Sequence, residues 1–257
     1  MHNKYLFLVF AFVITGSLCA QDAASIVEQS RNRIKSDTTS TRSRMVITAK
    51  NGTVTERVLD QYSKKDAQGN SRSVIVFQDP SSVRGTRFLS IENPGRSNDQ
   101  WIYLPSLAKV RRIAASEGSG SFMGTDFSYD DISSVDRKTA LDNHRILREE
   151  QYLGKDCYVI ESIPKDSSYQ YSKMIQWISR TDSVPYKIEL YDRRGNQVKL
   201  LEIVELNEVQ GRLSPMVTRM TTLADGTSTS INVMMLKYDD PIPDGVFTTN
   251  FLETGRP

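Results

Sequence analysis

The side chains with the most obvious chemical potential gather in and just after one glycine- and serine-rich stretch. Ser119 and Ser121 alternate with glycines, Asp126 and Asp130 follow shortly, and His144 is the only histidine beyond the first 20 residues. A serine, a histidine and a carboxylate are the parts of an activated nucleophile, and a lipid ester would suit it. The serines do not lie in a G-x-S-x-G motif. A lipid hydrolase is therefore an alternative interpretation.

Metal chemistry has few candidate ligands in this sequence. Neither His144 nor Cys157 belongs to a spacing that supplies several ligands to one ion. The acidic run Asp126, Asp130 and Asp131 offers oxygen ligands, but it lacks the twelve-residue loop and the terminal glutamate of a calcium site. We predict no metal and no cofactor.

The charges on the two sides of the glycine-rich stretch have a second interpretation, as a latch. Arg111 and Arg112 precede the stretch, whereas Asp126 and Asp130 follow it. Exposed ion pairs contribute ~0–1 kcal/mol each, which suits a segment that opens and closes. Gly118 and the glycines after it would form the hinge. Equally, the two runs could be solvated charges that never meet.

The residues before this stretch predict a strand and then a helical turn. Trp101 and Tyr103 are two apart, so they share one face of a short strand, which Pro105 ends. The apolar residues of 107–114 then recur at helical spacing, with basic residues between them. We expect a basic amphipathic turn there.

Three motifs in this region carry a family resemblance. They are Trp-x-Tyr-Leu-Pro at 101–105, Val-Arg-Arg-Ile at 110–113 and Gly-Ser-Phe-Met-Gly-Thr-Asp-Phe-Ser-Tyr-Asp-Asp at 120–131. Together they resemble the outer-membrane lipoprotein-sorting family, the LolA/LolB-like proteins. The resemblance implies an incomplete antiparallel β-barrel, lidded by helices, that holds the acyl chains of a lipoprotein or a phospholipid. It also implies a donor transporter in the inner membrane and an acceptor in the outer membrane.

The first 20 residues predict export. An apolar run at 5–14 is followed by mostly small residues, so residues 1–20 resemble a signal peptide cleaved after Ala20. Cys19 lies where a lipidated cysteine would, so a lipid anchor at Cys19 is the second interpretation. Without Lys4 the remaining chain has 32 basic residues against 31 acidic ones. This near-neutral balance excludes nucleic acid as a partner class, and we expect a periplasmic monomer.

Residues 21–257 predict a single, mainly β domain. An amphipathic helix is expected over 22–35, and from residue 41 the apolar residues alternate with a period of two. Turn sequences such as Asn51-Gly52 separate the alternating runs. The pattern predicts about ten or eleven antiparallel strands in an open barrel or strongly curved sheet. The N-terminal helix and a helical lid would cover its apolar concave face.

Aromatic and thioether side chains are the candidates for lining that concave face, because thioethers adapt to ligands without a fixed shape. Ordinary core packing is the alternative for each of them. We expect a ligand-binding cavity lined by Phe77, Phe88, Trp101, Tyr103, Phe122, Met123, Phe127, Met174, Trp177 and Met220.

Three functions follow from these expectations. The first is a carrier of acyl chains, because burying each CH₂ contributes ~0.8 kcal/mol and a whole chain on the order of 10 kcal/mol. The second is a lipid hydrolase that uses the same cavity. The third is a non-catalytic adaptor of a membrane transporter.

Overall fold

The strands of this protein form one continuous antiparallel sheet. The structure is a computed structural model that describes residues 22–94, 96–133 and 137–257. Within these residues 13 strands pair in the order β6-β5-β4-β3-β2-β1-β13-β12-β11-β10-β9-β8-β7. The first six strands are β1 (Thr38–Thr48), β2 (Val54–Lys65), β3 (Ser71–Asp79), β4 (Arg87–Ile91), β5 (Asp99–Leu104) and β6 (Lys109–Ile113). The others are β7 (Asp142–Tyr152), β8 (Lys155–Pro164), β9 (Lys173–Ser179), β10 (Pro185–Tyr191), β11 (Gln197–Val209), β12 (Arg212–Thr222) and β13 (Thr227–Tyr238).

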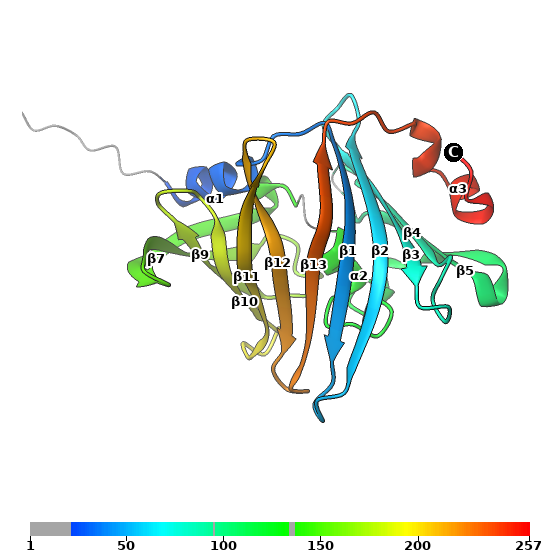
Figure 1. The fold of residues 1–257 in the computed structure, drawn as a ribbon. Helices are drawn as coiled ribbons and strands as arrows, with labels where there is room; N and C mark the ends of the chain where they lie inside the picture. Colours follow the sequence, from blue (N-terminus) through cyan, green and yellow to red (C-terminus); the bar gives the residue numbers. More distant parts are fainter. Residues whose placement is uncertain (1–21, 95, 134–136) are drawn as a thin grey trace, which may run out of the picture.

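Strands that follow one another in the sequence are hydrogen-bonded neighbours in the sheet, with the single exception of β6 and β7 among the described strands. At the centre β1 pairs with β13, so the ends of the chain's β region meet there. The edges are β6 and β7, which a long connection joins across one face. We call the face that this connection covers the inner face. Figure 1 looks onto the outer face, with the sheet curving back on both sides and α2 (Tyr129–Ser133) behind β1 and β2.

The turns follow the local sequence. Residues 49–53, which contain Asn51-Gly52, join β1 to β2 in place of the predicted two-residue turn. The Gly52 amide donates to the Ala49 carbonyl at 2.8 Å, and Gly52 has φ +82°, a conformation that glycine adopts without a steric penalty. Strands β1 and β2 then pair in register from Thr48↔Val54 to Thr38↔Lys64. The predicted hairpin is confirmed.

Two helices cover opposite faces at opposite ends of the sheet. The helix α1 (Ala23–Arg31) begins at Asp22, whose carboxylate accepts the Ser25 amide hydrogen at 2.9 Å. Its buried Ile26 and Val27 belong to one cluster with Ile160 and Ile178 of β8 and β9. The C-terminal helix α3 (Thr249–Thr254) packs on the outer face of β3 to β6. The predicted N-terminal helix is therefore present and ends at Arg31.

Two expectations about architecture were wrong. The sheet has 13 strands among the described residues rather than ten or eleven, and one of the additional strands is β6, which residues 109–113 form instead of a helical turn. Val110 pairs with Tyr103, and Leu107 is 67% exposed at the hairpin tip, so the helical repeat of apolar residues was accidental. The inner cover of the sheet is mostly irregular chain rather than a helical lid. The expected open, curved antiparallel sheet is confirmed, because the sheet is unclosed.

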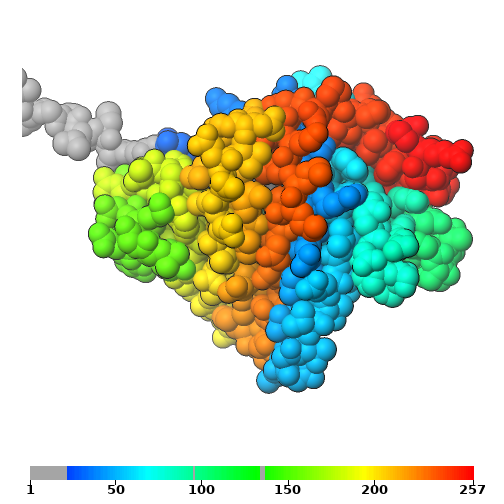
Figure 2. Space-filling model, in the orientation of Figure 1, coloured from blue at the N-terminus to red at the C-terminus, as the bar shows by residue number. Residues whose placement is uncertain are grey.

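The outer face of the central strands stays uncovered. Figure 2 shows β11, β12, β13, β1 and β2 side by side at the surface. Met234 and Met235 of β13 are 53% and 54% exposed, and neither belongs to a core cluster. Among the described residues no helix is long and apolar enough to cross a membrane. The predicted signal peptide and Cys19 lie outside the described residues and stay predictions.

Candidate functional site

The connection between the two sheet edges fills the inner face, and we call its residues 114–133 the plug. Phe122 is the largest plug side chain with no exposed surface. Its ring centroid lies 5.9 Å from that of Phe77, 5.2 Å from Phe88 and 5.4 Å from Tyr129. The same cluster contains Met45, Leu59, Ile75, Ile102 and Ile113. Phe122 therefore occupies the apolar face of the half-sheet β1 to β6.

Phe127 occupies the other half of the inner face. It belongs to a cluster with Met174, Leu190 and Met220 from β9, β10 and β12, and with Tyr171. Ile132 of α2 and Ile231 of β13 pack against both this cluster and the Phe122 cluster. The two clusters thus form one continuous apolar layer between sheet and plug, which we call the inner groove.

A tight turn sets the two phenylalanine side chains on this layer. The Phe122 amide donates to the Phe127 carbonyl at 2.7 Å, and Ser121 pairs with Ser128 as an isolated β-bridge. Met123 and Gly124 complete the turn with φ values of +54° and +75°. The Met123 carbonyl accepts a hydrogen bond from Arg57 Nη1 of β2 at 2.7 Å. The turn is therefore closed by its own backbone and also fastened to the sheet.

Asp126 fastens the plug to the centre of the sheet. Its carboxylate accepts hydrogen bonds from Thr227 Oγ1 and, at 2.6 Å, from Thr229 Oγ1 of β13. Its backbone amide donates to Thr229 Oγ1 at 3.0 Å. Thr229 is fully buried, so this polar anchor lies inside the otherwise apolar layer. Such a buried carboxylate needs these donors, because burying it unpaired would be very costly.

Asp131 fastens the plug to the second half-sheet. Its carboxylate accepts hydrogen bonds from Lys199 Nζ of β11 at 2.9 Å, from Tyr171 Oη at 2.9 Å and from Gln170 Nε2 at 3.0 Å. The Lys199 and Asp131 side chains are only 16% and 8% exposed. Burial, and secondly the Asp131 charge, raises the pKa of the Tyr171 hydroxyl, so Tyr171 stays a donor.

Asp130 contacts the first half-sheet. Gln100 Nε2 of β5 donates to its carboxylate at 3.1 Å. Burial raises the pKa of the Asp130 carboxyl, and repulsion from Asp131 adds to that rise. A Cβ atom added to Gly118 would lie 2.4 Å from Asp130 Oδ1. Gly118 has helical dihedral angles, so its lack of a side chain serves the close approach of Asp130 and not an unusual backbone conformation; the hinge stays a prediction.

The predicted latch of Arg111 and Arg112 with Asp126 and Asp130 does not form. The Arg111 guanidinium instead donates to Glu117 at 2.7 Å, and Arg112 pairs with Asp99. The reason is that β6 is a strand, whose successive side chains point to opposite faces. The two arginines therefore cannot reach the same partner, and the acidic residues find theirs on other strands.

Comparison with known proteins gives the family. A family model described as "Uncharacterized protein" matches residues 69–254, from just before β3 to the end of α3. The chain belongs to this family. No curated protein matches the sequence.

Solved structures of similar proteins share the fold over nearly their whole length. A DUF1329 family protein from Desulfovibrio piger is 28% identical, with a TM-score of 0.86 over 90% of this chain and 97% of that one. A putative outer membrane lipoprotein-sorting protein domain from Vibrio parahaemolyticus is 27% identical, with a TM-score of 0.85 over 90% and 98%. A LolA superfamily protein from Nitrosomonas europaea is 23% identical, with a TM-score of 0.72 over 90% and 99%, which shows the shared fold. The resemblance to the lipoprotein-sorting family is confirmed.

The inner groove brings together seven of the ten residues that we expected to line a cavity. They are Phe77, Phe88, Phe122, Met123, Phe127, Met174 and Met220. Phe77, Phe88 and Phe122 have no exposed surface, so the plug fills the groove in this structure. Met123 is only partly buried at the turn.

The other three expected residues lie on the outer face. Trp101 and Tyr103 pack under the residues that follow β13, among them Phe251 of α3. Trp177 packs with Cys157 and Val159. Strand periodicity could have predicted that Trp177 lies on the outer face. Trp177 is three residues from Met174, and residues an odd number apart on a strand point to opposite faces.

Several residues that hold the plug were not predicted. Lys199, Tyr171 and Thr229 are single polar residues on strands or in turns, with no motif around them. They become recognisable only when the sheet places them opposite plug carboxylates.

The residues of the alternative hydrolase do not meet. His144 Nδ1 lies 2.8 Å from Ser162 Oγ, and its Nε2 lies 3.0 Å from the Thr139 carbonyl. Ser162 is fully buried. Ser121 Oγ instead donates to the Thr125 carbonyl at 2.6 Å. Among the described residues no group of three or more His, Cys, Asp or Glu side chains could hold a metal ion.

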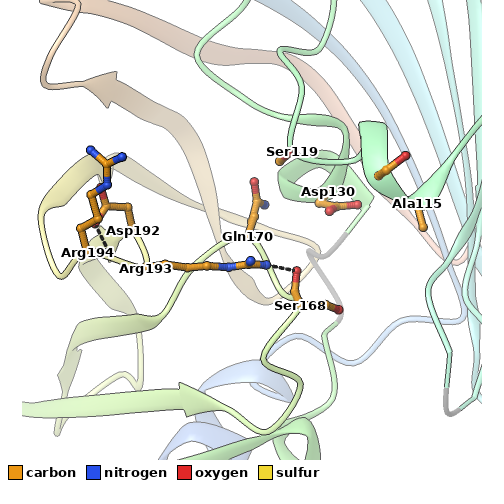
Figure 3. Close-up of a pocket in the computed structure, with 9 residues that line it drawn as sticks. Ala115, Ser119, Asp130, Ser168, Gln170, Asp192, Arg193 and Arg194 are labelled. Carbon is orange, nitrogen blue, oxygen red and sulfur yellow. Dashed lines mark hydrogen bonds between the residues drawn. The ribbon is translucent and has the colours of Figure 1, made fainter.

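A polar cleft of about 500 Å³ lies beside the plug. One side is made by the plug, and the other by the β8–β9 connection and the β10–β11 turn, as Figure 3 shows. The lining residues are Ala115, Ser116, Ser119, Asp130, Ser168, Gln170, Asp192, Arg193 and Arg194. Ser119, one of the candidate nucleophiles, therefore faces this cleft and not the inner groove.

Proposed function

We propose that this protein is a periplasmic carrier that binds acyl chains of a lipoprotein or a lipid in the inner groove and delivers them toward the outer membrane. The observation that carries the proposal is the plug itself. An apolar layer extends across both halves of an unclosed sheet, and irregular chain covers it instead of a further sheet layer. The similarity to a putative outer membrane lipoprotein-sorting domain supports the same function.

The free energies of burial of the plug and of a ligand are of similar size. Burial of the plug side chains Phe122, Phe127, Tyr129 and Ile132 contributes roughly 6–12 kcal/mol in all, at ~1.5–3 kcal/mol each. An acyl chain of ordinary length contributes on the order of 10 kcal/mol when it is buried. Because the two values are similar, neither the plug nor the ligand holds the groove irreversibly. A bound acyl chain can therefore replace the plug, and the plug can replace it again at the acceptor.

The first test is direct binding. An environment-sensitive fluorescent fatty acid should bind the exported chain, residues 21–257, and phospholipid should displace it. The absence of any binding over a wide range of protein concentrations would refute the carrier function.

A second test asks whether the plug must leave. Asp126 and Thr229 touch through their side chains, so the pair Asp126→Cys and Thr229→Cys should form a disulfide that ties the plug to β13. Binding should be lost in the oxidised protein and return on reduction. The control is Ser63→Cys with Ser73→Cys, a directly opposed pair of β2 and β3, whose disulfide leaves the plug free. Equal binding by both oxidised proteins would show that acyl chains do not enter the inner groove.

A further inference from the structure

The polar cleft beside the plug has two guanidinium groups whose surroundings leave donors available. Arg193 and Arg194 are both exposed in the β10–β11 turn. Arg193 Nη2 donates to the Ser168 carbonyl at 2.8 Å, which uses one of the five N–H donors of a guanidinium. Figure 3 shows the Arg193 side chain extended toward Ser168, with the Arg194 guanidinium turned away from that contact.

The carboxylates of the cleft, in contrast, are engaged within the protein. Asp192 Oδ1 accepts the backbone amide hydrogens of Arg194 at 2.8 Å and Asn196 at 2.9 Å. These bonds shape the turn and lower the pKa of the Asp192 carboxyl, the Asn196 amide having the largest effect. Asp130 Oδ1 accepts from Gln100 and lies against Gly118. The two carboxylates cancel the formal charge of the two guanidinium groups, but their hydrogen bonds come from the backbone of the turn and from Gln100 and not from the arginine side chains.

Neutral donors complete the lining on the side of the plug. Ser116 and Ser119 are exposed hydroxyl-bearing residues of the cleft. Gln170 is already committed, because its amide donates to Asp131 and accepts from Ser128 Oγ at 3.0 Å. Two arginines in one turn, with hydroxyl donors across the cleft, supply the kind of donors that match the oxygens of a phosphate. The Arg194 side chain is exposed, so it can rotate toward the Arg193 guanidinium.

We propose that this cleft binds a phosphate ester. The Arg193 and Arg194 guanidinium groups contact the phosphate oxygens, and the hydroxyls of the plug donate from the opposite side. The volume of about 500 Å³ accommodates the alcohol part of the ester as well as the phosphate. The ester is either the headgroup of a phospholipid or a soluble phosphate such as a glycerol phosphate.

The lipid source rests on the proposed function, whereas the phosphate chemistry does not. The plug separates the cleft from the inner groove, with Ser119 and Asp130 lining the cleft and Phe122 in the groove. A phospholipid whose acyl chains replace the plug in the groove would keep Arg193 and Arg194 as contacts of its phosphate, because both arginines belong to the β10–β11 turn and not to the plug.

The experiment is isothermal titration calorimetry on residues 21–257 at low salt. The probes are inorganic phosphate, glycerol 3-phosphate, and a short-chain phosphatidylglycerol below its critical micelle concentration, with the matching uncharged diacylglycerol as a blank. The variants are Arg194→Gln and the double variant Arg193→Gln with Arg194→Gln. Arg194→Gln alone keeps the Arg193–Ser168 contact, so it guards against a folding defect. Arg219→Gln, an exposed arginine of β12, is the matched control.

We expect binding of the phosphate esters to weaken at least about tenfold in Arg194→Gln and further in the double variant, and to be unchanged in Arg219→Gln. Binding of glycerol 3-phosphate without the lipid would identify a soluble ester as the ligand. Equal affinities in wild type and both cleft variants, or no binding of any phosphate by wild type, would overturn the proposal. Fluorescent fatty acid binding, measured on the same proteins, reports the inner groove separately, so either proposal can fail alone.

Discussion

Replacing Phe122 by alanine should destabilise the plug and, at the same time, strengthen acyl-chain binding. The Phe122 ring is fully buried and contacts three other aromatic rings at centroid distances of 5.2 to 5.9 Å. Truncation of a buried phenylalanine costs about 3–5 kcal/mol. If the ring occupies the place of an acyl chain, the same loss lowers the free energy needed to vacate the groove. Apparent affinity then rises by roughly 10²–10⁴-fold, because the binding-competent population rises by that factor.

Two measurements on the same protein test this reasoning. Urea unfolding gives the loss of stability, and fluorescence titration with a fatty acid probe gives the affinity. Phe247→Ala is the control, because Phe247 follows β13, is 3% exposed and packs on the outer face of the sheet with Val74 and Leu89. This control should lose comparable stability with no gain in affinity.

A fall in affinity for Phe122→Ala would mean that the ring is part of the wall that contacts the ligand. An unchanged affinity with the expected loss of stability would mean that ligand and plug do not compete. Either result refutes the competition between plug and acyl chain.

Three other substitutions probe the placement of single residues. Gly118→Ala should lower the free energy of unfolding in urea by about 1–3 kcal/mol, because the added Cβ would lie 2.4 Å from Asp130 Oδ1. The second substitution Asp130→Ala should recover most of this loss. No recovery would mean that the strain lies elsewhere. The pKa of Asp130 is raised in the folded protein, so its contribution to stability is full below the ordinary carboxyl pKa. That contribution is lost as pH rises through the raised pKa. Asp130→Asn should therefore raise Tm relative to wild type at pH 7 but not near pH 3. A pH-independent difference in Tm would contradict that direction. Trp177→Ala should lower the free energy of unfolding by about 3–5 kcal/mol, because Trp177 is only 3% exposed. Fatty acid affinity should stay unchanged, because Trp177 packs on the outer face. A large loss of affinity would place Trp177 in the binding site.

Most strands could be predicted from local sequence, because turns and alternation act over a few residues. Asn51-Gly52 set the β1–β2 hairpin, and Asp22 began α1 at the expected place. The prediction for residues 109–113 was wrong. Apolar residues three apart fit one face of a helix, but the same spacing can occur on a strand by chance. The pairing of this segment with β5 decided the outcome.

The sequence predicted that aromatic residues form the candidate site, but it predicted only some of those residues correctly. The aromatic residues of the motif at 120–131 do enter the apolar layer, but Trp101 and Trp177 lie on the other face. Residue type indicated burial, whereas the side of the sheet depended on strand register. Counting positions along β9 from Met174 would have corrected Trp177.

The sequence by itself determined the β-rich architecture, the N-terminal helix and the family, because each depends on residues close together in the chain. Tertiary structure alone decided that the motif segment fills the groove and which residues hold it there. Asp126 and Thr229 are 103 residues apart, and Asp131 and Lys199 are 68 apart. Such pairs carry no local signal, since they meet only after β1 and β13 join the two halves of the sheet and bring β11 and β13 beneath the plug.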